Sequence, residues 1–473
     1  MREIDVTQAQ LFLDEEVLAH HTLVQRVVHQ PVRYRINPVY QHEEPWEGGC
    51  ISFVSGVYRD EARGMFRGWY VTHPRCYDGI VSMLCTIESD DGVHWARPKL
   101  DLCRNVVGGP SNVLFASANG WDGPTVLHDP DDAEHPWKIV LFQFAGPSPD
   151  IYMGRSPDGI HWTIPEDPEQ AIIRNCGDRT SALVHRGADE RYVILTRDKS
   201  DMDDHQLVRC IYSATSRDAR TITGRPTLAL RPDLEDDPTL ELYQMGAFQY
   251  ESVLIGLIER YHRKERPYAD VELAVSRDAR TWQRVRPRSA FFAPPPNGRE
   301  HGAFDAAVST PGYSPPILYN NQLWFYYYGG PCFHGDRFLT ADRCIGLAKL
   351  RPDGFVSLRA GNREGVVTTR PFTWPGGRLQ VNVRVLGGNL WQYDAPETMD
   401  GWMRVEVLDD GGHPIAEFTR NEGDRFYRDD IAHEPMWGGR PQDLSRFEGK
   451  RIALRFLMRM AEIHSFRSVS LPT

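Results

Sequence analysis

Five acidic residues each stand just ahead of a short apolar run of strand type. They are Glu47, Asp122, Asp178, Glu251 and Asp305, and four of the five follow a tryptophan, tyrosine or phenylalanine. If these strands converge, like charges and partial desolvation raise the pKa of at least one carboxyl group and leave another ionised. Cleavage of a glycosidic bond needs that combination, because it uses a proton donor together with a base or nucleophile.

The residues around these acids suit a sugar. Aromatic side chains offer flat faces for a sugar ring, and arginine and histidine side chains can donate hydrogen bonds to hydroxyl groups. We expect the substrate to be contacted by Trp46, Trp121, Asp122, Arg179, Tyr250, Asp305 and His334. The competing interpretation is that the five acids are unrelated surface residues, since acids are common at the starts of strands.

A repeated turn motif interleaves with the acids and indicates how they are positioned. A Ser-x-Asp-Gly or Ser-x-Asp-Ala segment, leading to a tryptophan, occurs at residues 89–95, 156–162 and 276–282. Weaker copies occur at 216–222 and 351–355. Serine, aspartate and glycine favour a tight hairpin turn, and we expect the tryptophan to begin the next strand. The copies recur about every 60 to 70 residues, which is the size of a four-stranded propeller blade with long loops.

The sequence therefore predicts an all-β protein with a five-bladed β-propeller followed by a β-sandwich. The propeller is expected over residues 36–358, where each acid would lead the innermost strand of one blade. Residues 360–473 alternate apolar and polar positions between DDGG and PGG turns, which is typical of a two-sheet sandwich. Residues 1–35 form an N-terminal lead-in that packs on a blade or on the sandwich.

Composition narrows the function classes. The net charge of −11 repels phosphate backbones, so we expect no nucleic-acid partner. We find no signal peptide and no apolar run long enough to span a membrane, and we expect a cytoplasmic protein without a membrane partner. The eight cysteines are scattered and are expected to be reduced thiols. No cofactor motif is present and no metal is expected, because Cys332, His334 and Cys344 fit no standard zinc spacing.

The order of the motifs resembles glycoside hydrolase family 32 and, more distantly, family 43, both of which have five-bladed propellers. Residues 45–49 (PWEGG) stand where family 32 has the Trp-x-Asn-Asp-Pro-Asn-Gly stretch with its nucleophile. Residues 177–180 (GDRT) stand at the Arg-Asp-Pro stretch with its transition-state stabiliser, and residues 249–252 (QYES) at the Glu-Cys stretch with its acid/base. Residues 121–123 and 304–305 resemble two further family motifs.

The resemblance implies roles for three acids. Glu47 would be the nucleophile or base, Asp178 the stabiliser and Glu251 the general acid. The implied activity is a glycoside hydrolase, retaining by family analogy, that acts on a furanoside such as a fructoside or arabinoside within an oligosaccharide or small glycoside. Glu47 replaces the family's aspartate, and the second motif reads Asp-Arg, not Arg-Asp-Pro, which argues against a plain invertase.

Other interpretations stay open at this point. An inverting mechanism depends on the separation of the two carboxylates, which the sequence does not give. A glycoside phosphorylase or transglycosylase could use the same scaffold, and a phosphorylase would need two or three cationic groups for phosphate, of which Arg179 is the obvious candidate. A non-catalytic sugar-binding propeller is the third alternative, and homo-oligomerisation is left open.

Overall fold

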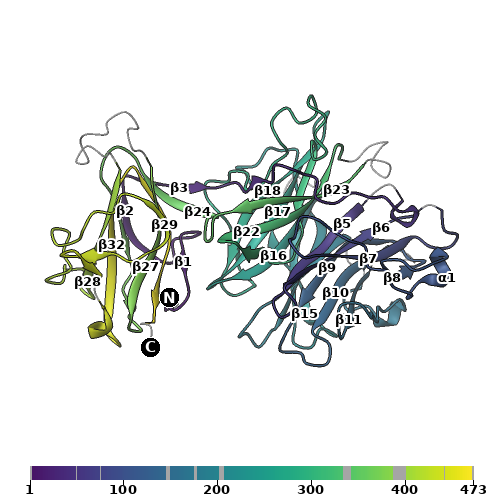
Figure 1. Cartoon of the computed structure of the whole chain (residues 1–473), viewed down its shortest axis with the longest axis horizontal. Coiled ribbons are helices and arrows are strands. Elements are labelled where there is room, and N and C mark those ends of the chain that lie inside the picture. The colour runs from purple at the N-terminus through teal and green to yellow at the C-terminus, as the bar shows by residue number, and fades with distance from the viewer. Residues whose placement is uncertain are drawn as a thin grey trace. The chain divides into compact units, whose positions relative to one another are not determined.

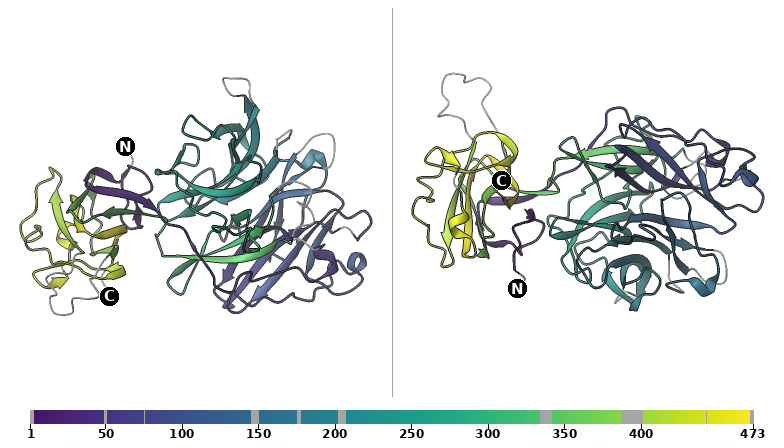
Figure 2. Two further views of the ribbon diagram at one scale, coloured as in Figure 1. Left: turned by 90° about the horizontal axis from the view of Figure 1, so that it is seen from above. Right: turned by 60° about the horizontal axis from the view of Figure 1, so that its bottom comes forward.

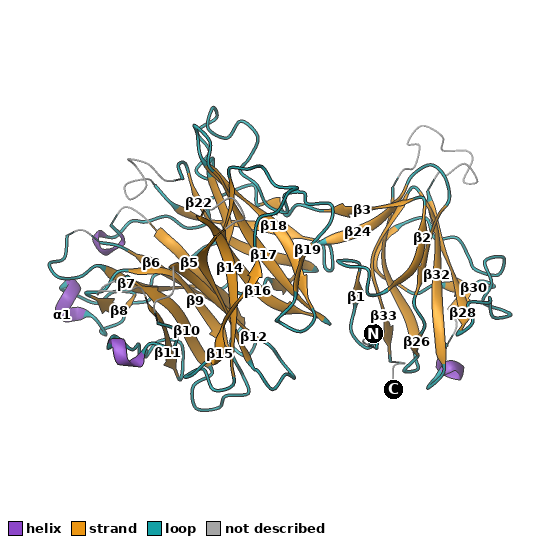
Figure 3. Ribbon diagram, turned by 180° about the vertical axis from the view of Figure 1, so that it is seen from behind, coloured by secondary structure: helices purple, strands orange, loops and turns teal. Residues whose placement is uncertain are grey.

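Nearly all regular structure in the chain is β-strand, as the sequence predicts (Figure 3). The structure is a computed structural model that describes residues 3–48, 51–74, 76–144, 150–174, 178–201, 207–333, 342–386, 401–441 and 443–470. In these ranges the helical segments are single turns, among them α1 (Arg104–Val107) and the 3-10 turn η1 (Pro45–Glu47). None of the helices described is long and apolar enough to cross a membrane.

The chain divides into two compact units. The central unit comprises Pro31–Arg284 and Ala290–Leu350. The C-terminal unit comprises Arg351–Thr473 together with Met1–Gln30 and the short segment Val285–Ser289. Each unit has its own hydrophobic core. Figure 1 shows the strands of both units, coloured from purple at the N-terminus to yellow at the C-terminus.

The central unit contains five antiparallel sheets, which follow one another along the described chain. Its strands are β4 (Val32–Arg33), β5 (Ile51–Asp60), β6 (Met65–Thr72), β7 (Ser82–Ser89), β8 (Val113–Ser117), β9 (Trp121–His128), β10 (Trp137–Gln143), β11 (Asp150–Ser156), β12 (Asp178–Val184), β13 (Tyr192–Asp201), β14 (Leu207–Ser216), β15 (Thr223–Leu230), β16 (Leu240–Tyr250), β17 (Val253–His262), β18 (Tyr268–Ser276), β19 (Trp282–Arg284), β20 (Val308–Pro311), β21 (Ile317–Tyr319), β22 (Gln322–Gly330) and β23 (Cys344–Leu350).

The five sheets are β5–β8, β9–β11, β12–β15, β16–β19, and β20–β23 with β4 at its edge. Consecutive sheets contact each other: β5 contacts β9, β9 contacts β12, β12 contacts β16, and β18 contacts β20. Strand β22 of the fifth sheet contacts β5 of the first. Most residues of β16, β17 and β22 are buried, so both faces of these strands are covered. Figure 2 shows the ribbon in two further views.

The repeated turn is confirmed in four sheets, where it follows the third strand. In the first copy the Ser89 hydroxyl accepts the Gly92 N–H at 2.8 Å, and Asp91 Oδ1 accepts the N–H of Val93 and of His94, each at 2.8 Å. The copies that begin at Ser156, Ser216 and Ser276 make the same bonds. The expectation that the tryptophan begins a strand holds only for Trp282, because residues 95 and 162 lie just before isolated bridges.

The C-terminal unit contains two larger antiparallel sheets and a short hairpin. Its strands are β1 (Gln10–Leu11), β2 (Leu18–Thr22), β3 (Val24–Val28), β24 (Val356–Ala360), β25 (Gly365–Thr369), β26 (Phe372–Thr373), β27 (Arg378–Val385), β28 (Trp402–Asp409), β29 (Asp429–His433), β30 (Met436–Trp437), β31 (Arg440–Pro441), β32 (Arg451–Arg459) and β33 (Ala461–Val469). One sheet has the order β29-β27-β33-β24-β3, and the other has the order β2-β25-β32-β26.

Side chains from both sheets of the C-terminal unit share one hydrophobic core, which includes Leu358, Ile463, Met403 and Phe456. Strands β1, β2 and β3 pair with β33, β25 and β24, so the first part of the chain completes both sheets. The sequence predicts the boundary between the propeller and the sandwich near residue 358. This position falls inside β24, and β24 belongs to the C-terminal unit. All residues of β24 except Arg359 are buried, so the strand has no alternation that would assign it to one unit or the other.

Candidate active site

Two of the five predicted acids, Asp122 and Asp178, lie on neighbouring strands of the central unit. Asp122 is the second residue of β9 and Asp178 is the first residue of β12, and these strands contact each other. Arg179 joins them: its N–H donates to Asp178 Oδ1 at 2.8 Å, and its Nε donates to Asp122 Oδ1 at 2.9 Å. The Asp122 side chain is 27% exposed and that of Asp178 is 32% exposed, so both carboxylates reach the surface.

Two buried arginines hold this pair of acids in place. Arg179 also donates from Nη1 to Gln244 Oε1 and Glu259 Oε2, both at 3.3 Å. Burial by itself lowers the pKa of Arg179, but Asp122, Glu259 and nearby tyrosines raise it well above the usual value, so the guanidinium stays charged. Arg197 pairs with Asp178 Oδ2 and donates to the main-chain carbonyl of Tyr243 at 3.0 Å.

Tyr243 on β16 lies at the centre of a cluster of guanidinium groups. The central carbon of Arg197 lies 4.0 Å from the centre of its ring, that of Arg179 5.0 Å, and that of Arg209 5.3 Å. Arg209 also pairs with the buried Glu241. The sequence suggested only Arg179 as a cation here, because the other arginines stand on second and third strands, where no motif marks them.

Two further titratable residues border the pair. His73 Nε2–H donates to the Trp121 carbonyl at 3.0 Å and its Nδ1 accepts from the Ser52 hydroxyl at 2.7 Å, which fixes the peptide next to Asp122. Burial lowers the pKa of His73, so this imidazole is neutral. Glu259 is fully buried, and burial raises its pKa even though the charge of Arg179 opposes the shift.

Glu47, the predicted nucleophile, is fully buried and accepts six hydrogen bonds. Its donors are the hydroxyls of Tyr40 at 2.8 Å and Tyr70 at 2.5 Å, the N–H groups of Glu43 and Glu44, and two nitrogens of Arg97. The two N–H bonds form because η1 turns the carboxylate back onto its own N-terminal turn. Both oxygens are occupied inside the protein, and the role of nucleophile stays a prediction.

Replacing Glu47 with glutamine should lower the free energy of unfolding at pH 7 by about 3–5 kcal/mol, because Arg97 loses a buried partner. Burial raises the pKa of Glu47, but Arg97 and the N–H donors outweigh it and bring the pKa below 4.5. Its stabilisation is therefore present above pH 4.5 and is lost as the pH falls through the folded value. Urea denaturation from pH 7 to pH 3 should show the variant and the parent converging; a constant difference would contradict this role.

Glu251, the predicted general acid, does not lead the first strand of its sheet, so the expectation that it leads an inner strand is wrong. Strand β16 begins at Leu240, and Tyr250 pairs with Val253, so Glu251 occupies the two-residue turn between β16 and β17 with φ of 51°. It is eight residues beyond Tyr243, or about 25 Å along an extended strand. Glu251 and Tyr250 are therefore at the opposite end of β16 from the arginine cluster.

The other predicted contacts have structural surroundings. Trp121 is fully buried and stacks on Phe115, and Trp46 is partly buried with its Nε1 donating to Asn112 at 2.9 Å. Asp305 is buried and accepts from Arg33 at 2.7 Å and from the Tyr327 hydroxyl at 3.0 Å. His334 lies outside the described residues.

No protein-family model matches the sequence, and no curated protein sequence matches it. Several solved structures are similar to the chain. A glycosyl hydrolase from Bacteroides ovatus is 16% identical with a TM-score of 0.46, over 69% of this chain and 94% of that one. The β-1,2-mannobiose phosphorylase from Listeria innocua, in complex with β-1,2-mannobiose, is 14% identical with a TM-score of 0.45, over 68% and 96%.

A third similar structure concerns the GH130 family of mannoside phosphorylases, which contains glycoside hydrolases that target β-1,2 mannosidic linkages in Candida mannan. It is 15% identical with a TM-score of 0.45, over 69% of this chain and 95% of that one. The resemblance to families 32 and 43 stays a prediction.

Proposed function

We propose that the five sheets of the central unit are the blades of a five-bladed β-propeller and that the C-terminal unit is a β-sandwich. The support for the propeller is the series of contacts between consecutive sheets, which returns from β22 to β5. In that architecture the first strands of the blades surround an axis. Asp122 and Asp178 would then lie near one end of this axis, with Tyr243 and its arginines beside them.

The function that the site supports best is cleavage of a glycosidic bond by Asp122 and Asp178. The observation that carries this proposal is that both carboxylates are partly exposed and are held together through one buried arginine residue. Such a pair can divide the work of proton donation and charge stabilisation. Glu47, whose two oxygens both accept hydrogen bonds, and Asp305, whose Oδ2 accepts from Arg33 and Tyr327, would serve the fold.

The hydrogen bonds around the two acids suggest different roles. Both oxygens of Asp178 accept, Oδ1 from the Arg179 N–H and Oδ2 from Arg197, which favours a charged carboxylate. We assign it the role of base, nucleophile or stabiliser of positive charge on the sugar. Among the described residues, only Arg179 donates to Asp122, and it does so at Oδ1. Within the described ranges Asp122 accepts one hydrogen bond and Asp178 accepts two, so Asp122 is the easier of the two to protonate, and its other oxygen can carry that proton to the substrate. We therefore assign Asp122 the role of general acid.

A phosphorylase is the second candidate, and the guanidinium cluster around Tyr243 favours it. Phosphorolysis needs cationic groups to hold the attacking phosphate, and arginine binds phosphate through two parallel hydrogen bonds. Arg209 is the most exposed of the three guanidinium groups, at 26%, and is the one nearest to solvent. Arg179 and Arg197 are already engaged by Asp122 and Asp178, so hydrolysis remains the first proposal.

A screen of glycans and aryl glycosides on the purified protein tests the proposal, with each substrate assayed with and without inorganic phosphate. Fructosides and arabinosides are the first substrates to try, because the family resemblance implies a furanoside. Release of free sugar without phosphate supports hydrolysis, and phosphate-dependent release of a sugar phosphate supports the second candidate. NMR of the first-formed anomer then separates retention from inversion. Binding of sugars with no turnover of any substrate would favour the sugar-binding alternative.

A further inference from the structure

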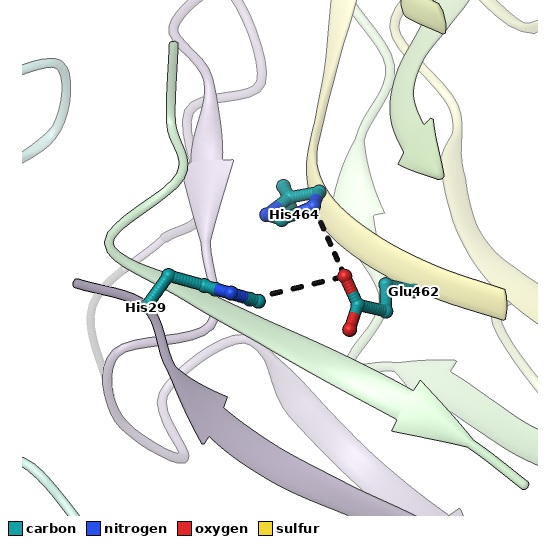
Figure 4. A group of neighbouring side chains, drawn as sticks. All are labelled: His29, Glu462 and His464. Carbon is teal, nitrogen blue, oxygen red and sulfur yellow. Dashed lines mark ion pairs between the residues drawn. The ribbon is translucent and has the colours of Figure 1, made fainter. Parts of the chain in front are cut away.

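Two histidines and a glutamate converge at one sheet of the C-terminal unit (Figure 4). Glu462 and His464 are alternate residues of β33, so their side chains leave the same face of the strand. His29 follows β3 directly, and its N–H donates to the Phe355 carbonyl. Because β24 lies between β33 and β3 in the sheet, the three side chains meet across it.

The three side chains are within the range of a shared ion. His29 Nε2 lies 3.9 Å from Glu462 Oε2, and His464 Nε2 lies 3.7 Å from the same oxygen. One donor atom from each of the three residues falls within 4.8 Å of the others. Ligand atoms of a tetrahedral zinc ion are about 3.3 Å apart, given metal–nitrogen and metal–oxygen bonds of about 2.0–2.2 Å. Shifts of a few tenths of an ångström would close the first two distances.

Burial makes this arrangement costly as it stands. Glu462 is 0% exposed and His464 is 2% exposed. Among the residues described, the Oε2 atom of Glu462 has no hydrogen-bond partner, and the ring of His464 has none but the Val356 main chain. Buried polar atoms without partners destabilise a fold. A ligand that bound both groups at once would remove this cost.

The charges near the site favour neutral imidazoles and an accepting carboxylate. Burial is the largest cause that lowers the pKa of His29 and of His464, and Arg351 and Arg384 lower both further. The charge of Glu462 opposes this shift at His29, and the Val356 main chain opposes it at His464. Neutral imidazole is the form that binds metals. Arg359 donates to Oε1 of Glu462, so it satisfies one carboxylate oxygen and leaves Oε2 for another partner.

We propose that His29, Glu462 and His464 bind a divalent transition-metal ion, with zinc as the ion that suits them best. Two imidazoles and one carboxylate are a common set of three zinc ligands, and the fourth position would be taken by water. The ion could enter beside His29, whose side chain is 20% exposed. It would replace the 2.8 Å hydrogen bond that His29 Nε2 now makes with the Ser357 hydroxyl.

The simplest competing explanation is an ion pair between protonated histidines and Glu462. The His–Glu distances of 3.7 and 3.9 Å are too long for hydrogen bonds. A bound ion satisfies all three groups without protonating any of them, and it ties β3 to β33 across β24.

The test is a zinc titration of the full chain after removal of bound metal with a chelator, with a chromophoric chelator as competitor. We expect one zinc ion per chain. Glu462→Gln and His464→Gln should each weaken binding by roughly 100-fold or more, since even outer partners of a ligand are worth 10–100-fold. Ser357→Ala should bind as tightly as the parent or tighter, because the hydroxyl that competes for His29 is gone.

His94→Gln serves as the matched control, because His94 is an exposed histidine that already pairs with an acid, Asp91. It should leave zinc binding unchanged. If a buried substitution does not fold, as judged by circular dichroism, His29→Gln gives the same test at the partly exposed ligand. X-ray absorption of the loaded protein should report two imidazole nitrogens. Absence of one-to-one binding, or equal binding by the parent and all three ligand variants, would overturn the proposal.

Discussion

Replacing Asp122 with asparagine should slow cleavage of glycosides with poor leaving groups by about 10²–10⁴-fold, which is the usual contribution of a general acid. Asparagine keeps the shape and can still accept from Arg179, but it has no proton to give to the leaving oxygen. Glycosides with activated aryl leaving groups need little protonation, so they should lose much less. The measurement is kcat against the pKa of the leaving group for the variant and the parent.

Asp178→Asn should slow the cleavage of glycosides with good and with poor leaving groups alike. Both reactions need a charged carboxylate next to the sugar, whichever leaving group the substrate carries. Glu251→Gln is the matched control, because it is a partly exposed acid at the other end of β16. It should remain fully active. A large loss in Glu251→Gln with normal activity in Asp122→Asn would move the site to that end of the strand and restore the assignment suggested by family 32.

Arg179→Met should have the second large effect, on stability. The arginine is 2% exposed and is the cation that Asp122 and Glu259 share. Removal of one partner from a buried ion pair costs about 3–5 kcal/mol, because a charge is left without compensation. Urea denaturation should show this loss of stability. Arg179→Lys should lose less than Arg179→Met but should stay below the parent, because one ammonium group cannot replace a guanidinium that pairs with Asp122 and Glu259 through different nitrogens.

The loss in Arg179→Met should also depend on pH. Burial raises the pKa of Glu259, and Arg179 is the main group that opposes the increase. Without the arginine, Glu259 can avoid an uncompensated charge by keeping its proton, so the deficit should grow as the pH rises above 4.5. Arg420→Met, which breaks a pair with Glu364 at about half exposure, should cost about 1 kcal/mol or less. Equal losses at the two sites would contradict a special role for Arg179.

The sequence predicted the local turn chemistry of this protein better than the site. A serine and an aspartate three and one residues before a left-handed glycine or alanine specify their turn without help from distant residues, so the repeat was readable. The order of strands and the all-β class follow from the same turn residues, which separate one strand from the next. These features depend on residues that are neighbours in the chain.

The roles of the acids depend on partners far away in the chain. The carboxylate of Glu47 accepts hydrogen bonds from Tyr70 and Arg97, and nothing in the segment PWEGG predicts those contacts. The same pair of an aromatic residue and an acid can stand before the first strand of a sheet or in a hairpin turn. The pattern therefore predicts the wrong position for Glu251. For the histidine and glutamate cluster the alternation Glu-x-His at 462–464 was visible, but the third member stands more than 400 residues earlier.

The pairing of β3 with β24, and of β24 with β33, has a consequence for how the chain is made. These strands are separated by the whole central unit, and β33 follows β3 by about 430 residues. At ribosomal rates of 5–20 residues per second, β3 waits about 20–90 s for its sheet to be completed. The central unit can fold during that interval, because all its strands have emerged. Until then strands β1 to β3 keep unpaired edges in the nascent chain. A chaperone that binds this N-terminal segment during translation would protect it from wrong pairing.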